Sequence, residues 1–190
     1  MSVRRIGVLA LQGAFDAHRR VLTGLGVEAP LVRSTRDLEG LDAIVLPGGE
    51  STTMQRFLAR DGLFEALGEF VAARPALGTC AGLILLAREV EPHQPSLGAL
   101  DVTVARNAYG RQRDSKVLRS ETRLPGGPLE MVFIRAPRIT RLGAGVEVLA
   151  RRGDDPVLVR QGHAIGCAFH PELGNDDRVH RLLIEACAHV

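Results

Sequence analysis

The chain has 190 residues, of which 45% are hydrophobic and 24% charged, the balance of an ordinary globular protein. Its formal net charge of +2 is too small to indicate nucleic-acid binding, and no apolar run approaches the roughly 18 residues of a membrane span. We therefore expect one domain over residues 1–190, located in the cytoplasm because the apolar stretch at 6–11 is too short for a signal peptide.

The first half of the chain alternates short apolar runs with segments of helical spacing. Residues 5–11 predict a strand because they are apolar and contain β-branched side chains, and residues 15–25 predict a helix that Gly26 closes. The same alternation predicts strands at 29–32, 41–46 and 75–79, and helices at 51–59, 63–73 and 81–87. This pattern is typical of an α/β fold with three layers, in which a mostly parallel central sheet has helices on both faces.

The second half changes character, because strand-like segments follow one another with turn signals between them. The expected strands are 100–106, 117–123, 129–134, 146–150, 156–161 and 164–169. A last helix is expected over 177–188, where apolar residues recur on one side. Successive strands joined by short turns predict an antiparallel extension of the sheet.

A cysteine between two glycines stands where a predicted strand meets a predicted helix. The segment GTCAG at 78–82 has the pattern of a nucleophile elbow, with Cys80 in the place of the more common serine. A sharp strand-to-helix turn requires small neighbours, and the helix N-terminus favours the thiolate. The backbone N–H of Ala81 then lies where an oxyanion would form. The alternative is a buried structural cysteine, but flanking glycines are poor core residues.

The segment HPE at 170–172 supplies a candidate base for this thiol. In extended backbone, residues two apart point to the same side, so Glu172 is expected to reach the imidazole of His170. A carboxylate in that position fixes the tautomer of the histidine and stabilises its charged form. Taken alone, the tripeptide favours a loop histidine beside a solvated glutamate, but together with the cysteine elbow it favours the catalytic pair.

Two other readings of the sequence are less favoured. The three cysteines are odd in number and widely spaced, which predicts free thiols, and a zinc site at Cys167, His163 and His170 would lie on a mostly apolar strand. The segment at 24–29 loosely matches a dinucleotide-binding fingerprint, but it follows a helix instead of a strand.

A second glycine-rich turn follows the strand at 41–46. In the segment PGGES at 47–51, backbone N–H groups of Gly48 and Gly49 could complete an oxyanion hole. A plain tight turn into a helix fits the same pattern.

Taken together, these motifs resemble the class I triad glutamine amidotransferases, and within them the glutaminase subunits of pyridoxal 5′-phosphate synthase, the PdxT/SNO family. The cysteine elbow and HPE are shared by the wider superfamily, whereas PGGESTT and FIRAP are more specific to this family. The matching segments are GVLALQG at 7–13, LPGGESTTM at 46–54, GTCAG at 78–82, RNAYGRQ at 106–112, FIRAP at 133–137 and HPEL at 170–173.

The resemblance implies a flavodoxin-like fold and roles for particular residues. The implied catalytic triad is Cys80, His170 and Glu172, and the implied oxyanion hole is Gly48, Gly49 and Ala81. The implied contacts to glutamine are Gly49, Glu50, Ser51, Arg106, Ile134 and Arg135. Free glutamine is a zwitterion, so its site needs both an anion and a cation.

Two positions depart from the usual pattern of the family. Lys116 stands where the family usually has phenylalanine, and the segment 16–18, Asp-Ala-His, replaces a more common Glu-His ending. We expect both to lie at the surface that faces the partner, outside the triad.

The resemblance implies that the chain hydrolyses L-glutamine through a cysteine thioester, without a metal or organic cofactor. The ammonia would pass to a pyridoxal 5′-phosphate synthase subunit within a large hetero-oligomer, whose docking would select the productive orientation of the Gly48–Gly49 peptide. Neither nucleic acid nor membrane is expected as a partner. A related Cys-His-Glu peptidase and a glutamine-binding regulatory subunit without catalysis are the alternatives.

Overall fold

The computed structural model describes residues 4–106 and 116–189. Its helices follow the expected order along the chain. They are α1 (Phe15–Gly24), α2 (Ser51–Leu58), α3 (Leu63–Ala73), α4 (Ala81–Leu86) and α5 (Arg178–Ala186), with short 3-10 helices η1 (Thr35–Leu38), η2 (Pro171–Leu173) and η3 (Cys187–His189).

A seven-stranded sheet forms the centre of the molecule, in the order β10-β11-β12-β4-β3-β1-β2. Its strands are β1 (Ile6–Leu9), β2 (Leu31–Val32), β3 (Ala43–Leu46), β4 (Ala76–Thr79), β10 (Glu147–Arg152), β11 (Asp155–Gln161) and β12 (Ala164–Cys167). The five strands from β12 to β2 are parallel, and β11 and β10 continue the sheet in antiparallel fashion. The predicted fold class, a mostly parallel sheet with an antiparallel extension, is therefore confirmed.

Two smaller sheets lie beside the central one. The first contains β5 (Ala87–Glu91), β6 (Leu100–Ala105) and β9 (Arg138–Leu142), and the second is the hairpin of β7 (Lys116–Ser120) and β8 (Leu129–Phe133). The sequence did not predict β5 or β9. In β5, a register shift between Ala87 and Glu89 interrupts the apolar alternation that would have indicated a strand.

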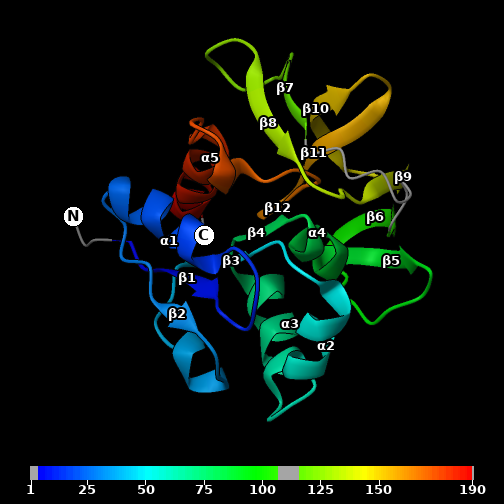
Figure 1. Cartoon of the computed structure of the whole chain (residues 1–190). Coiled ribbons are helices and arrows are strands. Elements are labelled where there is room, and N and C mark those ends of the chain that lie inside the picture. The colour runs from blue at the N-terminus through cyan, green and yellow to red at the C-terminus, as the bar shows by residue number, and fades with distance from the viewer. Residues whose placement is uncertain (1–3, 107–115, 190) are drawn as a thin grey trace.

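Helices cover both faces of the central sheet (Figure 1): α1 and α5 lie on one face, and α3 and α4 on the other. Strands β1, β3, β4 and β12 are buried along their whole length, which explains why they appear in the sequence as short continuous apolar runs. Hydrophobic side chains from both halves of the chain form one buried cluster.

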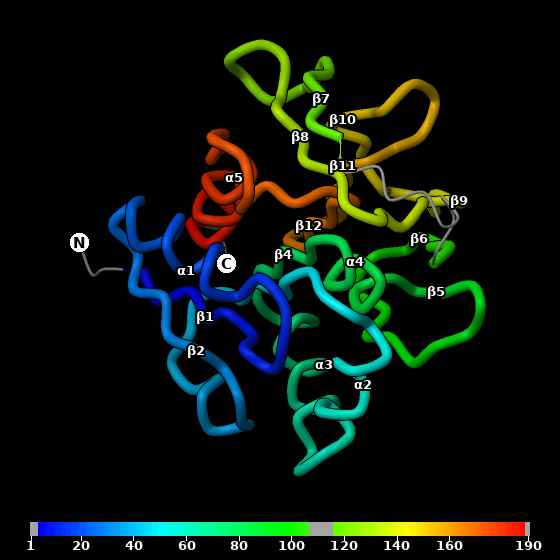
Figure 2. Tube along the Cα trace, in the orientation of Figure 1, coloured from blue at the N-terminus to red at the C-terminus, as the bar shows by residue number. Residues whose placement is uncertain are grey.

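The carboxyl ends of the parallel strands bring distant parts of the sequence to one edge of the sheet. Figure 2 traces how β12, near the end of the chain, lies beside β4 from its middle, with Cys167 opposite Thr79. In open α/β sheets, this edge is where ligands bind. None of the helices in the described part of the chain has the length and apolar composition needed to cross a bilayer.

Candidate active site

Cys80 occupies the turn between β4 and α4 in a backbone conformation that is rare for residues with a side chain, with φ of 51° and ψ of −103°. The glycines of the motif explain why this turn can form. A Cβ on Gly82 would collide with the carbonyl oxygen of Leu46, and one on Gly78 would collide with the backbone of Gly82. The elbow geometry predicted from the sequence is therefore present.

The backbone N–H groups of Cys80 and Ala81 lie next to the sulfur along the chain, and among the described residues only the first has a partner within the central sheet. The N–H of Cys80 donates to the carbonyl of Cys167 at 2.9 Å, so the central sheet already uses it. The N–H of Ala81 belongs to the first residue of α4, where no carbonyl of the same helix can accept it. This arrangement agrees with the expectation that Ala81 contributes to an oxyanion hole.

His170 and Glu172 form a buried pair beside Cys80. The distance between His170 Nδ1 and Glu172 Oε1 is 2.7 Å, and both residues are at least 93% shielded from solvent, with relative exposures of 7% and 6%. The sequence argument for this contact assumed extended backbone. Instead, Pro171 starts the 3-10 helix η2, and the turn carries the carboxylate back to the ring.

The charge state of His170 depends on its two partners. Burial disfavours the imidazolium, but hydrogen bonds with Cys80 and Glu172 outweigh burial and raise the pKa of His170 to about 10. A charged ring between two acceptors is what a thiolate–imidazolium–carboxylate series requires.

A cleft of about 500 Å³ opens above these side chains. Every residue that the sequence suggested for the oxyanion hole or for substrate contact lines it, together with Cys80 and His170. Its lining is Gly13, Ala14, Gly48, Gly49, Glu50, Ser51, Thr52, Cys80, Ala81, Ile84, Arg106, Ile134, Arg135, Pro137, His170 and Leu173.

The glycine-rich turn after β3 faces the catalytic side chains. A Cβ on Gly48 would collide with the ring of His170, so no larger residue fits there. The carbonyl of Gly48 accepts a hydrogen bond from Ala14 N–H at 3.2 Å. The side chain of Gln12 clamps the next residue, since its Oε1 accepts from Glu50 N–H at 3.1 Å and its Nε2 donates to Glu50 O at 3.0 Å. The motif that contains Gln12 was recognised in the sequence, but no role was predicted for Gln12 itself.

Glu50 lines the cleft, but its carboxylate caps helix α2. It accepts hydrogen bonds from the N–H groups of Thr52 and Thr53, at 3.1 and 2.7 Å, and from both threonine hydroxyls. These bonds, first those from the hydroxyls, lower the pKa of Glu50 to about 2. The side chain expected to meet the ammonium group of glutamine therefore already has four donors.

Arg106 and Ser51 meet at a residue that sequence reasoning missed. Gln94, buried in the loop after β5, accepts hydrogen bonds at its Oε1 from Ser51 Oγ at 3.1 Å and from Arg106 Nη1 at 2.5 Å. Among the described residues, the buried Nε of Arg106 has no partner. The rest of the motif that begins at Arg106, residues 107–112, lies outside the described residues.

Ile134 and Arg135 follow β8 at the edge of the cleft. Arg135 has a positive φ of 44°, as does Cys80, with a φ of 51°, which lines the same cleft. Strained backbone of this kind tends to gather at functional sites. The N–H of His170 donates to the carbonyl of Val132 at 2.8 Å, which joins the hairpin to the catalytic segment.

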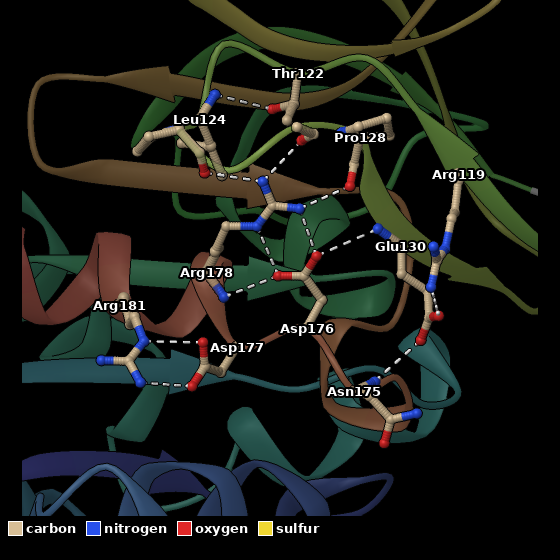
Figure 3. A network of polar contacts seen from close by, with 12 residues as sticks. Arg119, Thr122, Leu124, Pro128, Glu130, Asn175, Asp176, Asp177, Arg178 and Arg181 are labelled. Carbon is tan, nitrogen blue, oxygen red and sulfur yellow. Dashed lines mark hydrogen bonds and ion pairs between the residues drawn. The ribbon is translucent and has the colours of Figure 1, made fainter.

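A salt-bridged network holds the same hairpin from its other end (Figure 3). The guanidinium of Arg178 uses all five of its N–H donors: two on Asp176 and three on the backbone carbonyls of Pro125, Gly127 and Pro128. The β7–β8 hairpin is thereby tied to the start of α5.

The expectation for the departures from the family pattern was half wrong. Lys116 and Asp16 are exposed, but His18 is completely buried, with its ring against Thr79 and His180. The helical spacing could have revealed this, because His18 lies one turn before the buried Leu22. Cys80, Cys167 and Cys187 are free thiols, as predicted, and no cluster of metal ligands occurs among the described residues.

Comparisons with known proteins match nearly the whole chain. The model of the SNO glutamine amidotransferase family matches residues 8–189. A curated relative from Koribacter versatilis, named "Pyridoxal 5'-phosphate synthase subunit PdxT", is 56% identical over 182 residues, which is 95% of this chain and 94% of the relative. The protein of the same name from Thermus thermophilus is 52% identical over 185 residues, or 95% and 96% of the two chains.

Solved structures give the same result. A crystal structure described as a glutamine amidotransferase is 48% identical and superimposes with a TM-score of 0.90, over 96% of this chain and 98% of the other. PurLQS from Thermotoga maritima, at 15% identity, shares the fold with a TM-score of 0.67 over 97% and 99% of the chains. Since the family model and the relatives cover nearly its whole length, the chain belongs to the SNO glutamine amidotransferase family.

Proposed function

We propose that this chain is the glutaminase subunit of a pyridoxal 5′-phosphate synthase and hydrolyses L-glutamine to L-glutamate and ammonia. The observation that carries this proposal is the series Cys80, His170 and Glu172. In it, the thiol of a cysteine on strained backbone meets a buried histidine–carboxylate pair at one cleft. A cleft of about 500 Å³ suits a small polar substrate. The names of the relatives above point to the same activity.

In the first half of the reaction, the thiolate of Cys80 attacks the side-chain amide carbon of glutamine. Negative charge develops on the amide oxygen, and the N–H of Ala81 and a peptide N–H of the Gly48–Gly49 turn stabilise it. The imidazolium of His170 gives its proton to the leaving nitrogen, so that ammonia departs and a thioester remains on Cys80.

In the second half, His170 is neutral and acts as a base. It takes a proton from a water molecule, which attacks the thioester carbon, and glutamate leaves as the Cys80 thiolate forms again. Glu172 holds the ring in the required tautomer and stabilises its charge in both halves. Each proton lost by water is thus returned to His170, and no metal or organic cofactor takes part.

The two charged ends of glutamine would be bound at the rim of the cleft. We assign the α-carboxylate to Arg106 and Arg135, the arginines among the lining residues, with Ser51 and the backbone of Ile134 beside them. Because the Glu50 carboxylate caps α2, we expect it to attract the ammonium group as a fixed charge without releasing its threonine partners.

The ammonia would pass to the synthase subunit of a hetero-oligomer. A reaction of this kind benefits from direct transfer of ammonia between the subunits. We propose a cytoplasmic location for this assembly.

A coupled assay tests the function. Wild-type chain with the synthase subunit should release ammonia and glutamate in equal amounts from glutamine, and Cys80→Ala should lose nearly all of this activity because triad members act as a unit. Peptide cleavage without glutamine hydrolysis would favour the related peptidase. Glutamine binding without ammonia release by the wild type would favour a regulatory subunit.

We also predict that the isolated chain is a weak glutaminase that its partner activates. The Gly48 carbonyl is held by Ala14 N–H, so turning the Gly48–Gly49 peptide would break a single 3.2 Å hydrogen bond. Losing one oxyanion donor typically costs about a hundred- to a thousand-fold in rate. Ammonia release should therefore rise strongly when the synthase subunit is added. Full activity of the chain alone, unchanged by a partner shown to bind, would contradict this gating.

A further inference from the structure

Three buried polar side chains lie next to the triad and take no part in the chemistry described so far. His18 on α1, Thr79 at the end of β4 and His180 on α5 are completely shielded from solvent, and none of them lines the cleft. Burying polar groups together is costly unless they bond to one another. The contacts of these three side chains therefore indicate which group they hold in position.

Glu172 connects this cluster to the triad. Its Oε1 is occupied by His170 at 2.7 Å, and its Oε2 lies 3.3 Å from His18 Nε2. The same Nε2 is 3.1 Å from Thr79 Oγ1, so one N–H faces two oxygens, and its contact with Oε2 falls short of a fully aligned hydrogen bond. Within the described part of the chain, Oε2 has no other polar partner.

The surroundings of the two outer ring nitrogens, His18 Nε2 and His180 Nδ1, determine which nitrogens of the pair carry protons. His18 Nδ1 and His180 Nε2 are 2.9 Å apart, so one of them donates to the other. His180 Nδ1 is buried and has no partner among the described residues. A proton on that atom would leave a buried donor unpaired and would turn a lone pair of His18 toward the carboxylate. If the proton is on His180 Nε2 instead, His180 Nδ1 is an unpaired acceptor, which costs less than an unpaired donor. His18 then carries its own proton on Nε2, and this N–H points at Glu172.

Each ring carries a single proton, because burial disfavours the doubly protonated imidazolium. Burial lowers the pKa of His180 to about 4. Burial, followed by the positive charges of His180 and His170, also lowers the pKa of His18 well below 6.5. Both rings are therefore neutral near pH 7.

We propose that His180 and His18 form a chain of hydrogen bonds, from His180 Nε2–H to His18 Nδ1 and from His18 Nε2–H to Glu172 Oε2, that positions the carboxylate of the triad. Both histidines are positioning residues. They act on His170 through Glu172, and their role in turnover rests on the proposed glutaminase function.

Among the described residues, few other titratable groups lie beside these hydrogen bonds. Besides His170, the thiol of Cys167 on β12 interacts with Glu172, and burial raises the pKa of this thiol well above its ordinary value. Asp177, at the start of α5, faces His180 and is itself paired with Arg181. Within the described residues, neither group donates a hydrogen bond to Oε2, so His18 is the group to test.

The first test needs no substrate. Nitrogen-15 NMR of the full-length wild-type chain distinguishes protonated from unprotonated ring nitrogens, and the His18→Gln and His180→Gln variants assign the two rings. Both histidines should be neutral near pH 7 and protonated at Nε2. A proton on Nδ1 of either ring would overturn the proposal, whether or not the chain hydrolyses glutamine.

The second test measures turnover with the synthase subunit present. His18→Leu removes the donor, and we expect kcat for glutamine to fall roughly 10- to 100-fold, the range typical of lost outer partners of a functional group. His18→Gln keeps an N–H near the ε position and should recover most of this loss. His180→Leu should cost less, because it acts only through His18.

A control and a spectroscopic signature separate positioning from stability. Leu22→Ala, one turn along the buried face of α1, should lower the melting temperature and leave kcat per folded chain unchanged. The NMR titration of His170 should move down by about one pH unit in His18→Leu, a tenfold change in its protonation equilibrium, but not in Leu22→Ala. An unmoved His170 titration in His18→Leu would refute the positioning role, whereas an inactive wild type would refute only the glutaminase function.

Discussion

At the scale of single residues, Glu50 carries two demands on one carboxylate. The sequence suggested it as the anion that meets the ammonium group of glutamine, and the structure shows it capping α2 through Thr52 and Thr53. The two demands are compatible only if the carboxylate attracts the substrate from its capping position. Substitution can separate them, because the cap needs an acceptor and the substrate needs a charge.

We predict that Glu50→Gln and Glu50→Ala differ in a defined way. Glu50→Ala removes the cap and should lower the free energy of unfolding by about 1 kcal/mol. Glu50→Gln keeps an acceptor, so it should retain much of that stability and raise the KM for glutamine. Urea unfolding and steady-state kinetics measure the two effects. Equal KM values for Glu50→Gln and wild type would remove Glu50 from substrate binding.

The sequence could predict the residues of the cleft better than their supporting contacts. Cys80 and His170 belong to short motifs whose chemistry depends on near neighbours, so their pattern is visible in the sequence. His18 contacts Thr79, 61 residues away in the sequence, and Gln94 contacts Ser51, 43 residues away, so only tertiary packing brings these side chains together. The helical periodicity could have placed His18 on a buried face, but it could not have indicated that Glu172 would lie there.

At the scale of elements, the β7–β8 hairpin depends on its attachment more than on its own pairing. An isolated two-stranded hairpin is only marginally stable in water. Here the backbone bond from His170 to Val132 fixes one end, and Arg178 fixes the other through three carbonyls and Asp176 (Figure 3). The segment with Ile134 and Arg135, which follows this hairpin, is therefore held in place by the attachments to His170 and Arg178.

We predict that Arg178→Met releases this hairpin. The change leaves Asp176 without its bidentate partner and three carbonyls without a donor, which should cost about 2 kcal/mol or more of unfolding free energy. Amide hydrogen exchange should become faster in residues 116–133 and stay unchanged in β1 and β3. Arg181→Met, which removes an exposed pair with Asp177 on the same helix, is the matched control and should change little. Similar exchange in both variants would contradict the role of Arg178.

The elements themselves were predictable where packing and local pattern agree. The fully buried strands of the central sheet and helices α1 to α5 have clear periodicity or clear apolar runs. Strand β9 was missed because it pairs with β6 along one edge and exposes charged residues such as Arg138 and Arg141, so its burial lacks a regular alternation. Which strands join which sheet was not predictable, since that choice depends on contacts between distant segments.

At the scale of the whole molecule, the buried histidines should make stability depend on pH. In the unfolded chain, a histidine has its ordinary pKa of 6.5, whereas burial lowers the pKa of His180 to about 4 and that of His18 well below 6.5. As pH falls through this window, the unfolded state binds more protons than the folded state. The free energy of unfolding should therefore decrease on acidification, by up to about 1.4 kcal/mol per pH unit for each proton.

Urea unfolding between about pH 6 and pH 5 measures this effect. His170, whose raised pKa of about 10 gives the opposite pH dependence near pH 7, is largely protonated in both states in this range, and carboxylates with lowered pKa values, such as Glu50, act at lower pH. His180→Leu should remove about half of the pH dependence, whereas the exposed His93→Leu should leave it unchanged. A wild-type stability that is flat over this range would show that the buried pair titrates normally.

The order of strands in the central sheet also has a consequence for how the protein is made. Strand β12 lies between β11 and β4, and it brings His170 and Glu172 to Cys80, although it begins only at Ala164. While a ribosome is still synthesising the chain, the sheet has a gap beside β4 and the thiol has no base. The nascent chain therefore cannot assemble its triad until β12 and η2 have been translated, so synthesis of this late segment precedes any capacity to attack an amide.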